Sequence, residues 1–294
     1  MSAIESAPAP ALASAGRARG RRPSTATVWR WELRKLVSQK RTYLGLGLAV
    51  ILPLIFVLVQ LLQGGRGHDR GNIFASHITQ SGLATPVLML LFLAAFMLPL
   101  IAALVAGDIV ANEDGNGTLK TILTRSVDRG QVFAGKTLAA MTYGTIAVFL
   151  SAAVATAAGV ASWGFNEVIT FSGSVVSAPE GLALVFAANA CYLIPLLSVV
   201  AIGVLLSTAT RNSAASVVGT VGLVILLYIV SGIPGIEGVK PYLLTEQFQS
   251  WQGLLRTPTY WAPIWHSLWV CALYAIPALV AGYLVFLRRD VAGG

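Results

Sequence analysis

Six long apolar segments alternate with polar segments along the chain. A helix needs about 20 consecutive apolar residues to cross the hydrocarbon core of a bilayer, and each of the six segments is long enough. The pattern therefore predicts six transmembrane helices, which together comprise about half of the chain. They are expected at residues 44–63, 83–107, 138–163, 182–207, 214–236 and 264–287.

The composition agrees with a lipid environment. Of the 294 residues, 56% are hydrophobic and 11% are charged, whereas charged residues make up about 25% of a typical soluble domain. These proportions exclude an ordinary soluble domain and a disordered chain. The two cysteines, Cys191 and Cys271, lie inside apolar segments and have no spacing typical of a disulfide framework or a zinc site.

The basic residues are divided unequally between the two sides of the predicted membrane domain. Segments 1–43, 108–137, 208–213 and 288–294 hold 16 of the 20 Lys and Arg residues, and the three loops on the other side hold 4. Cytoplasmic segments of membrane proteins carry the excess of Lys and Arg. The bias therefore predicts a multi-pass protein of the cytoplasmic (plasma) membrane with both termini in the cytoplasm.

The chain divides into an N-terminal part and one membrane domain. Residues 1–23 are rich in Ala, Pro and Arg without an apolar period, which predicts a disordered cytoplasmic tail. Residues 24–43 are expected to form an amphipathic interfacial helix, and residues 44–287 the six-span domain. The remaining predicted segments are a cytoplasmic loop at 108–137, an outer loop at 237–263 and a cytoplasmic tail at 288–294.

The helix before the first span has one apolar face. Trp29, Leu33 and Leu36 recur at helical spacing, and cationic residues occupy most of the other positions. Such a helix can lie flat on the inner leaflet, although positive-inside anchoring alone also explains its charge. Glu32 is an exception among these cations and is expected to pair with Lys35, three residues on, or with a partner protein.

The loop at 108–137 is too short for a domain and too long for a turn. It begins with acidic residues, Glu113 and Asp114, which a glycine-rich turn and a short amphipathic stretch follow. This order predicts a structured element presented to the cytosol and held by the membrane or by another chain. The alternative for Glu113 and Asp114 is a solvated acidic turn.

Several motifs do not support an enzyme. Residues 130–137 match the phosphate-binding pattern GxxxxGK(S/T), but no apolar strand precedes them, and Lys136 is better explained as an anchor at the lipid surface. His68 and His77 lie in a glycine-rich loop without metal-site spacing. No nucleophile motif of the GxSxG type is present. We therefore expect no catalytic, cofactor or metal residue in this chain, and no binding of nucleic acid.

Two patches resemble the permease subunits of ABC transporters of the type-2 exporter (ABC-2) family. In that family, a Glu-Leu pair on an amphipathic helix precedes the first span, as Glu32 and Leu33 do here. The family often has a proline near the position of Ser126, where this chain departs from the pattern. The loop residues similar to the family signature are Glu113, Gly117, Thr118, Leu119, Leu123, Arg129, Gly135 and Lys136.

The resemblance implies a half-transporter of the bacterial cytoplasmic membrane that has no ATPase of its own. Two such chains, identical or homologous, would bind two ABC ATPase subunits, and ATP and Mg would be held by the ATPases. The loop would be a coupling helix, and segment 237–263 is similar to the family's short outer helices that dip back into the membrane. The implied ATPase-contacting residues are Glu32, Glu113, Asp114, Gly117, Thr118, Leu119, Leu123 and Arg129.

The expected fold is an all-α integral membrane protein with six transmembrane helices, an interfacial helix and a coupling helix. The expected cargo is a hydrophobic or amphipathic small molecule, because the predicted spans contain no Asp, Glu, Lys or Arg at membrane depth. Two other functions remain open at this point. One is an ion-coupled carrier, which usually needs such a residue, and the other is a scaffold or sensor that recruits a cytosolic partner without transport.

Overall fold

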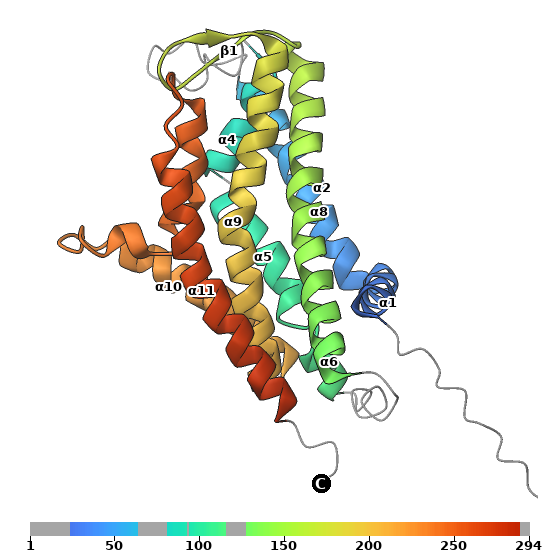
Figure 1. The fold of residues 1–294 in the computed structure, drawn as a ribbon. Coiled ribbons are helices and arrows are strands. Elements are labelled where there is room, and N and C mark those ends of the chain that lie inside the picture. The colour runs from blue at the N-terminus through green and yellow to red at the C-terminus, as the bar shows by residue number, and fades with distance from the viewer. Residues whose placement is uncertain (1–23, 64–80, 93, 116–127, 289–294) are drawn as a thin grey trace, which may run out of the picture.

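The computed structural model describes residues 24–63, 81–92, 94–115 and 128–288, and most of these residues are helical (Figure 1). Two short strands pair antiparallel, with Val168 opposite Val176. The elements are α1 (Thr25–Val37), α2 (Lys40–Gln63), α4 (Ala84–Phe92), α5 (Ala94–Ala106), α6 (Ala111–Gly115), α8 (Arg129–Trp163), β1 (Val168–Ile169), β2 (Val175–Val176), α9 (Ala178–Thr210), α10 (Ser213–Ser231), the 3₁₀ helices η1 (Lys240–Tyr242) and η2 (Glu246–Leu255), and α11 (Ala262–Leu287).

Six helical segments are long and apolar enough to cross a membrane, which confirms the predicted all-α fold with six candidate spans. In the part of the chain that the structure describes, sheet is limited to β1 and β2. The topology predicted from charge stays a prediction. The candidate spans are Lys40–Leu62, Ala94–Glu113, Arg129–Trp163, Ala178–Thr210, Ser213–Ser231 and Ala262–Leu287.

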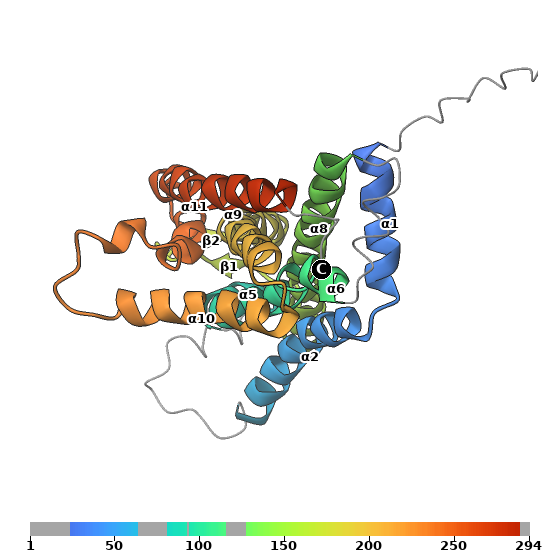
Figure 2. The same cartoon turned by 90° about the horizontal axis from the view of Figure 1, so that it is seen from below.

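Helix α9 lies at the centre of the bundle. It packs against α5, α8, α10, α11 and η2, and in the view from below α10 and α11 flank it on opposite sides (Figure 2). The central position explains why α9 buries residues all around its circumference, as the four consecutive residues Ser198, Val199, Val200 and Ala201 show. Helices α2, α10 and α11 instead expose many large apolar side chains, as expected for surfaces that face lipid.

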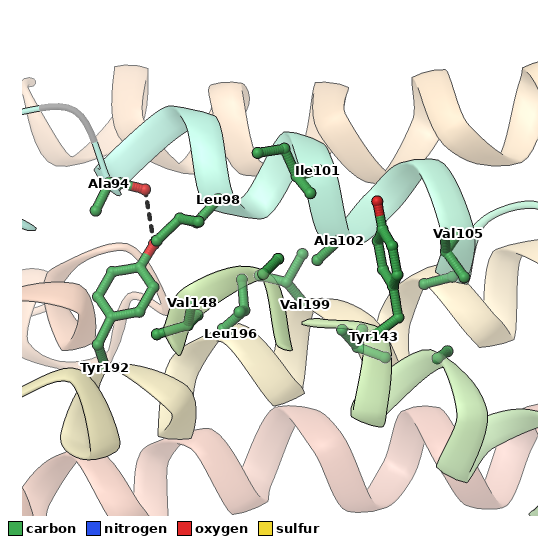
Figure 3. Packing of buried hydrophobic residues seen from close by; sticks show 14 of the residues in the cluster. Ala94, Leu98, Ile101, Ala102, Val105, Tyr143, Val148, Tyr192, Leu196 and Val199 are labelled. Atoms are coloured by element: carbon green, nitrogen blue, oxygen red, sulfur yellow. Dashed lines mark hydrogen bonds between the residues drawn. The ribbon is translucent and has the colours of Figure 1, made fainter. Parts of the chain in front are cut away.

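The second predicted span, 83–107, includes residue 93, which lies outside the described residues. Two helices, α4 and α5, cover this segment, and the candidate span begins at Ala94. Tyr192 of α9 donates a hydrogen bond of 2.6 Å from its hydroxyl to the carbonyl oxygen of Ala94, the first residue of α5 (Figure 3).

The core of the bundle is built where α5, α8 and α9 meet. Side chains from the three helices interdigitate there, and Figure 3 shows Leu98 and Ile101 of α5 with Val148 of α8 and Leu196 of α9. Small residues let the helices approach closely, as is usual in membrane bundles. Gly203 of α9 is one of them, because an added Cβ would lie 2.8 Å from the Cβ of Ala106.

The end of the bundle that carries β1 and β2 is tied together by backbone contacts (Figure 1). Gly82, just before α4, lies against Gly159 near the end of α8 so closely that a Cβ on either residue would overlap the backbone of the other. The Gly82 N–H also donates to the carbonyl oxygen of Gly164, at 3.0 Å. Each glycine is therefore required for this close approach.

The predicted outer loop, 237–263, contains η1 and η2. Helix η2 packs against α9 and α11 and buries Phe248 and Trp251 completely. The Phe171 N–H donates to the carbonyl oxygen of Leu255 at 2.9 Å, which joins the β1–β2 hairpin to the end of η2. Whether this segment dips into a membrane stays a prediction.

The N-terminal part contains one helix, α1, which lies against α8 (Figure 2). It begins at Thr25, one residue after the start of the predicted segment 24–43, because the Ser24 side chain caps it by accepting from the Thr27 N–H. The interfacial position of α1 stays a prediction. The predicted disordered tail at 1–23 and most of the tail at 288–294 lie outside the described residues.

Candidate functional site

Four charged side chains meet where α1, α6 and α8 come together, at the end of the bundle opposite β1 and β2 (Figure 1). Three of them are almost fully enclosed by protein: Glu32 is 8% exposed, Glu113 is 2% exposed and Lys136 is 0% exposed. Burying a charge is costly unless it is paired. We refer to Glu32, Lys35, Glu113 and Lys136 as the ion-pair network.

Lys136 is the centre of the ion-pair network. Its Nζ lies 2.9 Å from Glu32 Oε1 and 2.6 Å from Glu113 Oε2, and it donates to the carbonyl oxygen of Ile109 at 3.2 Å. Lys136 thus donates hydrogen bonds to Glu32 and Ile109 and forms an ion pair with Glu113. The side chain of Lys136 therefore links α8 simultaneously to α1, to α6 and to the turn before α6.

Glu113 connects the second lysine to the ion-pair network. Its Oε1 accepts from the Nζ of Lys35 on α1, while its Oε2 faces Lys136. Each glutamate is thus paired with at least one lysine, and the two positive and two negative charges balance. Charge balance is what allows the group to be buried at all.

The ammonium group of Lys35 is less favourable in this position than in water. Burial, followed by repulsion from Lys136, lowers the pKa of Lys35 from 10.5 to about 8. The attraction of Glu32 acts in the opposite direction and is smaller than the effect of burial. Lys35 is the most accessible member of the ion-pair network, with 40% of its side chain exposed.

The local sequence explains why α1 can bring Glu32 to Lys136. Val28, Glu32 and Leu36, spaced four residues apart on α1, form the face that packs against α8. The partner position on α8 is Gly135, where a Cβ would lie 2.6 Å from Val28 Cγ1. A glycine next to Lys136 therefore lets α1 approach α8 closely enough for the ion pair to form.

A second charged group fixes the turn between α5 and α6. The carboxylate of Asp108 pairs with Arg41 of α2 and accepts a hydrogen bond from the Ser213 hydroxyl at the start of α10. The Ser207 hydroxyl oxygen accepts from the N–H groups of Val110 and Ala111, at 3.1 and 3.0 Å. These contacts orient α6, and hence Glu113, relative to α2, α9 and α10.

Arg129 lies at a different place, at the first residue of α8. Its guanidinium donates to the carbonyl oxygen of Leu287 at 2.8 Å, and Leu287 is the last residue of α11. The preceding residue, Asp128, caps α8 by accepting from the Gly130 N–H at 3.1 Å. Arg129 thus connects the start of α8 to the end of α11. A cation is favourable at the C-terminal end of a helix such as α11.

The structure brings together two of the residues that the sequence predicts to contact an ATPase, Glu32 and Glu113, and does so inside this chain. Asp114 belongs to α6, and the structure describes its backbone only. The contact of these residues with an ATPase stays a prediction. The other predicted loop residues, Gly117, Thr118, Leu119 and Leu123, lie outside the described residues.

Lys136 is the residue whose role sequence reasoning misses. It is enclosed by protein and not placed as an anchor at the lipid surface, and Glu32 pairs with it and not with Lys35. The isolated glutamate among the cations of α1 was the signal that a buried cation lay opposite. The apparent phosphate-binding motif at 130–137 is part of the continuous helix α8, whereas that motif needs an open loop before its helix.

The remaining motif residues do not add to this site. Among the described residues, no group of three or more His, Cys, Asp or Glu side chains could hold a metal ion. His68 and His77, which the sequence argues against as ligands, lie outside the described residues. Cys191 and Cys271 are unpaired thiols within α9 and α11.

Two comparisons with known proteins bear on the chain. A stretch of 44 residues is 50% identical to the protein named "Probable ABC transporter permease protein NosY" of Stutzerimonas stutzeri, and it covers 15% of this chain and 16% of that protein. The matched stretch is a small part of either chain, and the six long apolar helices indicate a multi-pass membrane protein. The model of a family described as "Protein of unknown function (DUF2705)" matches residues 47–292. Since this match covers most of the chain, the protein belongs to the DUF2705 family.

Proposed function

We propose that this chain is the membrane-spanning subunit of an ATP-driven exporter of the ABC-2 type. In this proposal it moves a hydrophobic or amphipathic small molecule across the bacterial cytoplasmic membrane. The observation that carries the proposal is the buried ion-pair network, which joins α1, α6 and α8 into one unit. The short similarity to a probable ABC transporter permease supports the same assignment.

Members of the ion-pair network flank residues 116–127, the segment that would receive force from an ATPase. Glu113 lies in α6, which precedes residues 116–127, and Lys136 lies in α8, which follows them. A force applied to the intervening segment therefore acts on α6 and α8 together, and through Glu32 and Lys35 on α1. This is the connection that a coupling element requires.

Helix α8 is suited to carry such a force across the membrane. Its 35 residues correspond to a length of about 52 Å, which exceeds the hydrocarbon core of about 30 Å. The first turns of α8 therefore extend beyond the core, where α1 covers them. Motion at Lys136 is transmitted along a single continuous helix to Trp163.

The distribution of charge supports an external source of energy. In the described parts of the candidate spans, the charged residues of α2, α5–α6 and α8 lie at the ends that meet α1, and Glu180 lies in the first turn of α9. An ion-coupled carrier usually needs an ionisable residue at membrane depth. We infer that two separate ABC ATPase subunits bind ATP and Mg, and that two permease chains, identical or homologous, form the pathway.

The test is purification of the tagged chain from its native membrane, followed by reconstitution of the chain with the proteins that copurify. We expect the ATPase to copurify and its ATP hydrolysis in nanodiscs to be stimulated by an amphipathic cargo. Leu119→Asp, in the segment predicted to contact the ATPase, should abolish copurification while leaving thermal stability unchanged. Lys240→Met, in the outer loop, is the matched control and should retain both copurification and stimulation.

Two results would contradict the proposal. Movement of cargo by the chain alone on an ion gradient would establish an ion-coupled carrier. Copurification of a cytosolic partner that neither binds nor hydrolyses ATP would establish a recruiting scaffold or sensor. Full copurification of the ATPase by Leu119→Asp would remove the loop from the coupling interface.

A further inference from the structure

A groove lies where η1 and η2 meet the start of α11, far from the ion-pair network. Its volume is about 450 Å³, within the range of sites that hold small molecules. It is open on one side and therefore accessible to a group from the surrounding medium. The lining residues are Pro241, Glu246, Gln247, Gln249, Ser250, Tyr260, Ala262, Pro263 and His266.

The donors of Gln247 are used within the wall of the groove. Its Nε2 donates to the carbonyl oxygens of Pro241 and Leu243, at 2.6 and 3.0 Å. Because both neighbours are carbonyl oxygens, the atom that faces them must be the amide nitrogen. Gln247 is 4% exposed, so these two hydrogen bonds fix its amide in the wall of the groove.

His266 is oriented in the same way. Its Nε2 lies 2.9 Å from the carbonyl oxygen of Pro241, and since a carbonyl only accepts, Nε2 carries the proton. The carbonyl oxygen of Pro241 thus accepts a hydrogen bond from each of two lining side chains, Gln247 and His266.

The groove contains a carboxylate and a hydroxyl group, each of which can accept a hydrogen bond from a ligand. Glu246 carries the one formal charge among the lining residues, and its side chain is exposed. Ser250 is 5% exposed, and its Oγ has no hydrogen-bond partner among the described residues. A complementary ligand group has a positive charge and several N–H donors, as a primary ammonium has.

A quaternary ammonium fits the groove less well. It has no N–H donor and is bound by cages of several aromatic rings, whereas Tyr260 is the one phenol or indole ring among the lining residues. The chemistry of the groove therefore discriminates an ethanolamine headgroup from a choline headgroup.

Tryptophans beside the groove indicate the depth at which it lies. Trp261, Trp265 and Trp269, at the start of α11, are 55%, 65% and 47% exposed. Exposed tryptophans of membrane proteins concentrate at the level of the lipid headgroups. We refer to these three tryptophans as the apolar ledge. The ring of Trp269 also packs edge-on against His266, with centroids 5.0 Å apart, so the apolar ledge adjoins the groove.

We propose that this groove binds the primary ammonium headgroup of a membrane amphiphile, an ethanolamine phospholipid, with Glu246 as its counter-ion. The apolar part of the lipid lies along Trp265 and Trp269. The site is independent of the proposed transport function, because it requires neither an ATPase nor cargo.

The test measures lipid retention by native mass spectrometry of the purified chain. The protein is exchanged in parallel into phosphatidylethanolamine, phosphatidylcholine and phosphatidylglycerol of identical acyl composition. We expect preferential retention of phosphatidylethanolamine, and a loss of about tenfold in Glu246→Gln, because a hydrogen bond to a charged group is removed. Glu237→Gln is the matched control, since Glu237 is an outer-loop carboxylate that faces Lys240 at 3.6 Å and does not line the groove.

Equal retention of the three phospholipids by the unmodified chain would overturn the proposal. So would equal losses in Glu246→Gln and Glu237→Gln. A third arm adds free ethanolamine at millimolar concentration. If it displaces the phospholipid completely, the groove takes a soluble amine and the lipid assignment is wrong, whereas retention of the phospholipid supports the contribution of the apolar ledge.

Discussion

The Nζ of Lys136 lies 2.9 Å from the Oε1 of Glu32, and this contact joins two residues that are 104 positions apart in the sequence. Both side chains are nearly inaccessible to solvent. The pair holds α1 against α8, so that the helix before the first candidate span and the helix after residues 116–127 form one packed unit. The predictions below test this unit and its connections.

Removal of the central cation should be strongly destabilising. Lys136→Met replaces the ammonium with an apolar group of similar length and leaves Glu32 and Glu113 with fewer partners. Breaking a buried pair in this way costs about 3–5 kcal/mol, which a thermal unfolding assay in detergent would detect. Lys240→Met is the control, because Lys240 is partly exposed and faces Glu237 at 3.6 Å, where a pair contributes about 0–1 kcal/mol. Equal losses in the two variants would contradict the importance of burial.

The close approach of α1 to α8 should depend on Gly135. Gly135→Ala places a Cβ 2.6 Å from Val28 Cγ1, so α1 must move away, and overpacking of this kind costs about 1–3 kcal/mol. Gly47 of α2 offers a matched control, because an added Cβ there meets no atom within 4 Å. Gly47→Ala should be neutral or stabilising by up to about 1 kcal/mol. Thermal unfolding of both variants decides the point, and an unchanged Gly135→Ala protein would disprove the tight contact.

The amine of Lys35 should react at an unusually low pH. Burial, and then repulsion by Lys136, lowers the pKa of Lys35 to about 8, so half-maximal acylation of Lys35 by an amine-reactive reagent is expected near pH 8. In the denatured chain the midpoint should return toward 10.5. Peptide mass spectrometry after brief labelling gives both values. A folded-state midpoint near 10.5 would show that the lysine is not desolvated.

The same shift sets a pH dependence of stability. Between pH 8 and 10.5 the unfolded chain retains a proton that the folded chain has released from Lys35, so this group makes the free energy of unfolding rise with pH in that window. Below pH 8 both states hold the proton and Lys35 contributes no slope. Denaturation of the Lys35→Met variant should lack the rise, and an identical profile in the two proteins would refute it.

The hydroxyl of Tyr192 should stabilise the start of α5. Tyr192→Phe removes the 2.6 Å hydrogen bond to the carbonyl oxygen of Ala94, at an expected cost of about 0.5–1.5 kcal/mol. Tyr274→Phe removes a longer bond, of 3.1 Å, to the carbonyl oxygen of Tyr242 near the surface, and should have the smaller effect on thermal unfolding. The reverse order would show that the buried hydroxyl adds no stability.

Hydropathy predicted the number of candidate spans well and their ends less well. Helix α8 begins at Arg129, nine residues before the apolar segment at 138, because its first turns are covered by α1 and need not be apolar. A span is predicted from the length of its apolar stretch. That length does not show which parts of the helix are covered by protein and which by lipid.

The candidate site could be predicted in part. Glu32 and Glu113 stood out as acidic residues in cationic or glycine-rich surroundings, but their partners lie far away in the sequence. Lys35 pairs with Glu113 across 78 positions and Lys136 with Glu32 across 104. Contacts of such separation depend on how α1 crosses α8, which the periodicity of either helix alone does not determine.

The glycine contact at the opposite end of α8 has a mechanical consequence. Gly159 is pressed against Gly82, roughly 35 Å along the helix axis from Lys136. A rigid helix that is held near one end and displaced at the other rotates about the held point. A small tilt imposed near Lys136 would therefore swing the middle of α8 sideways against α5 and α9, while the rim that carries β1 and β2 stays almost still.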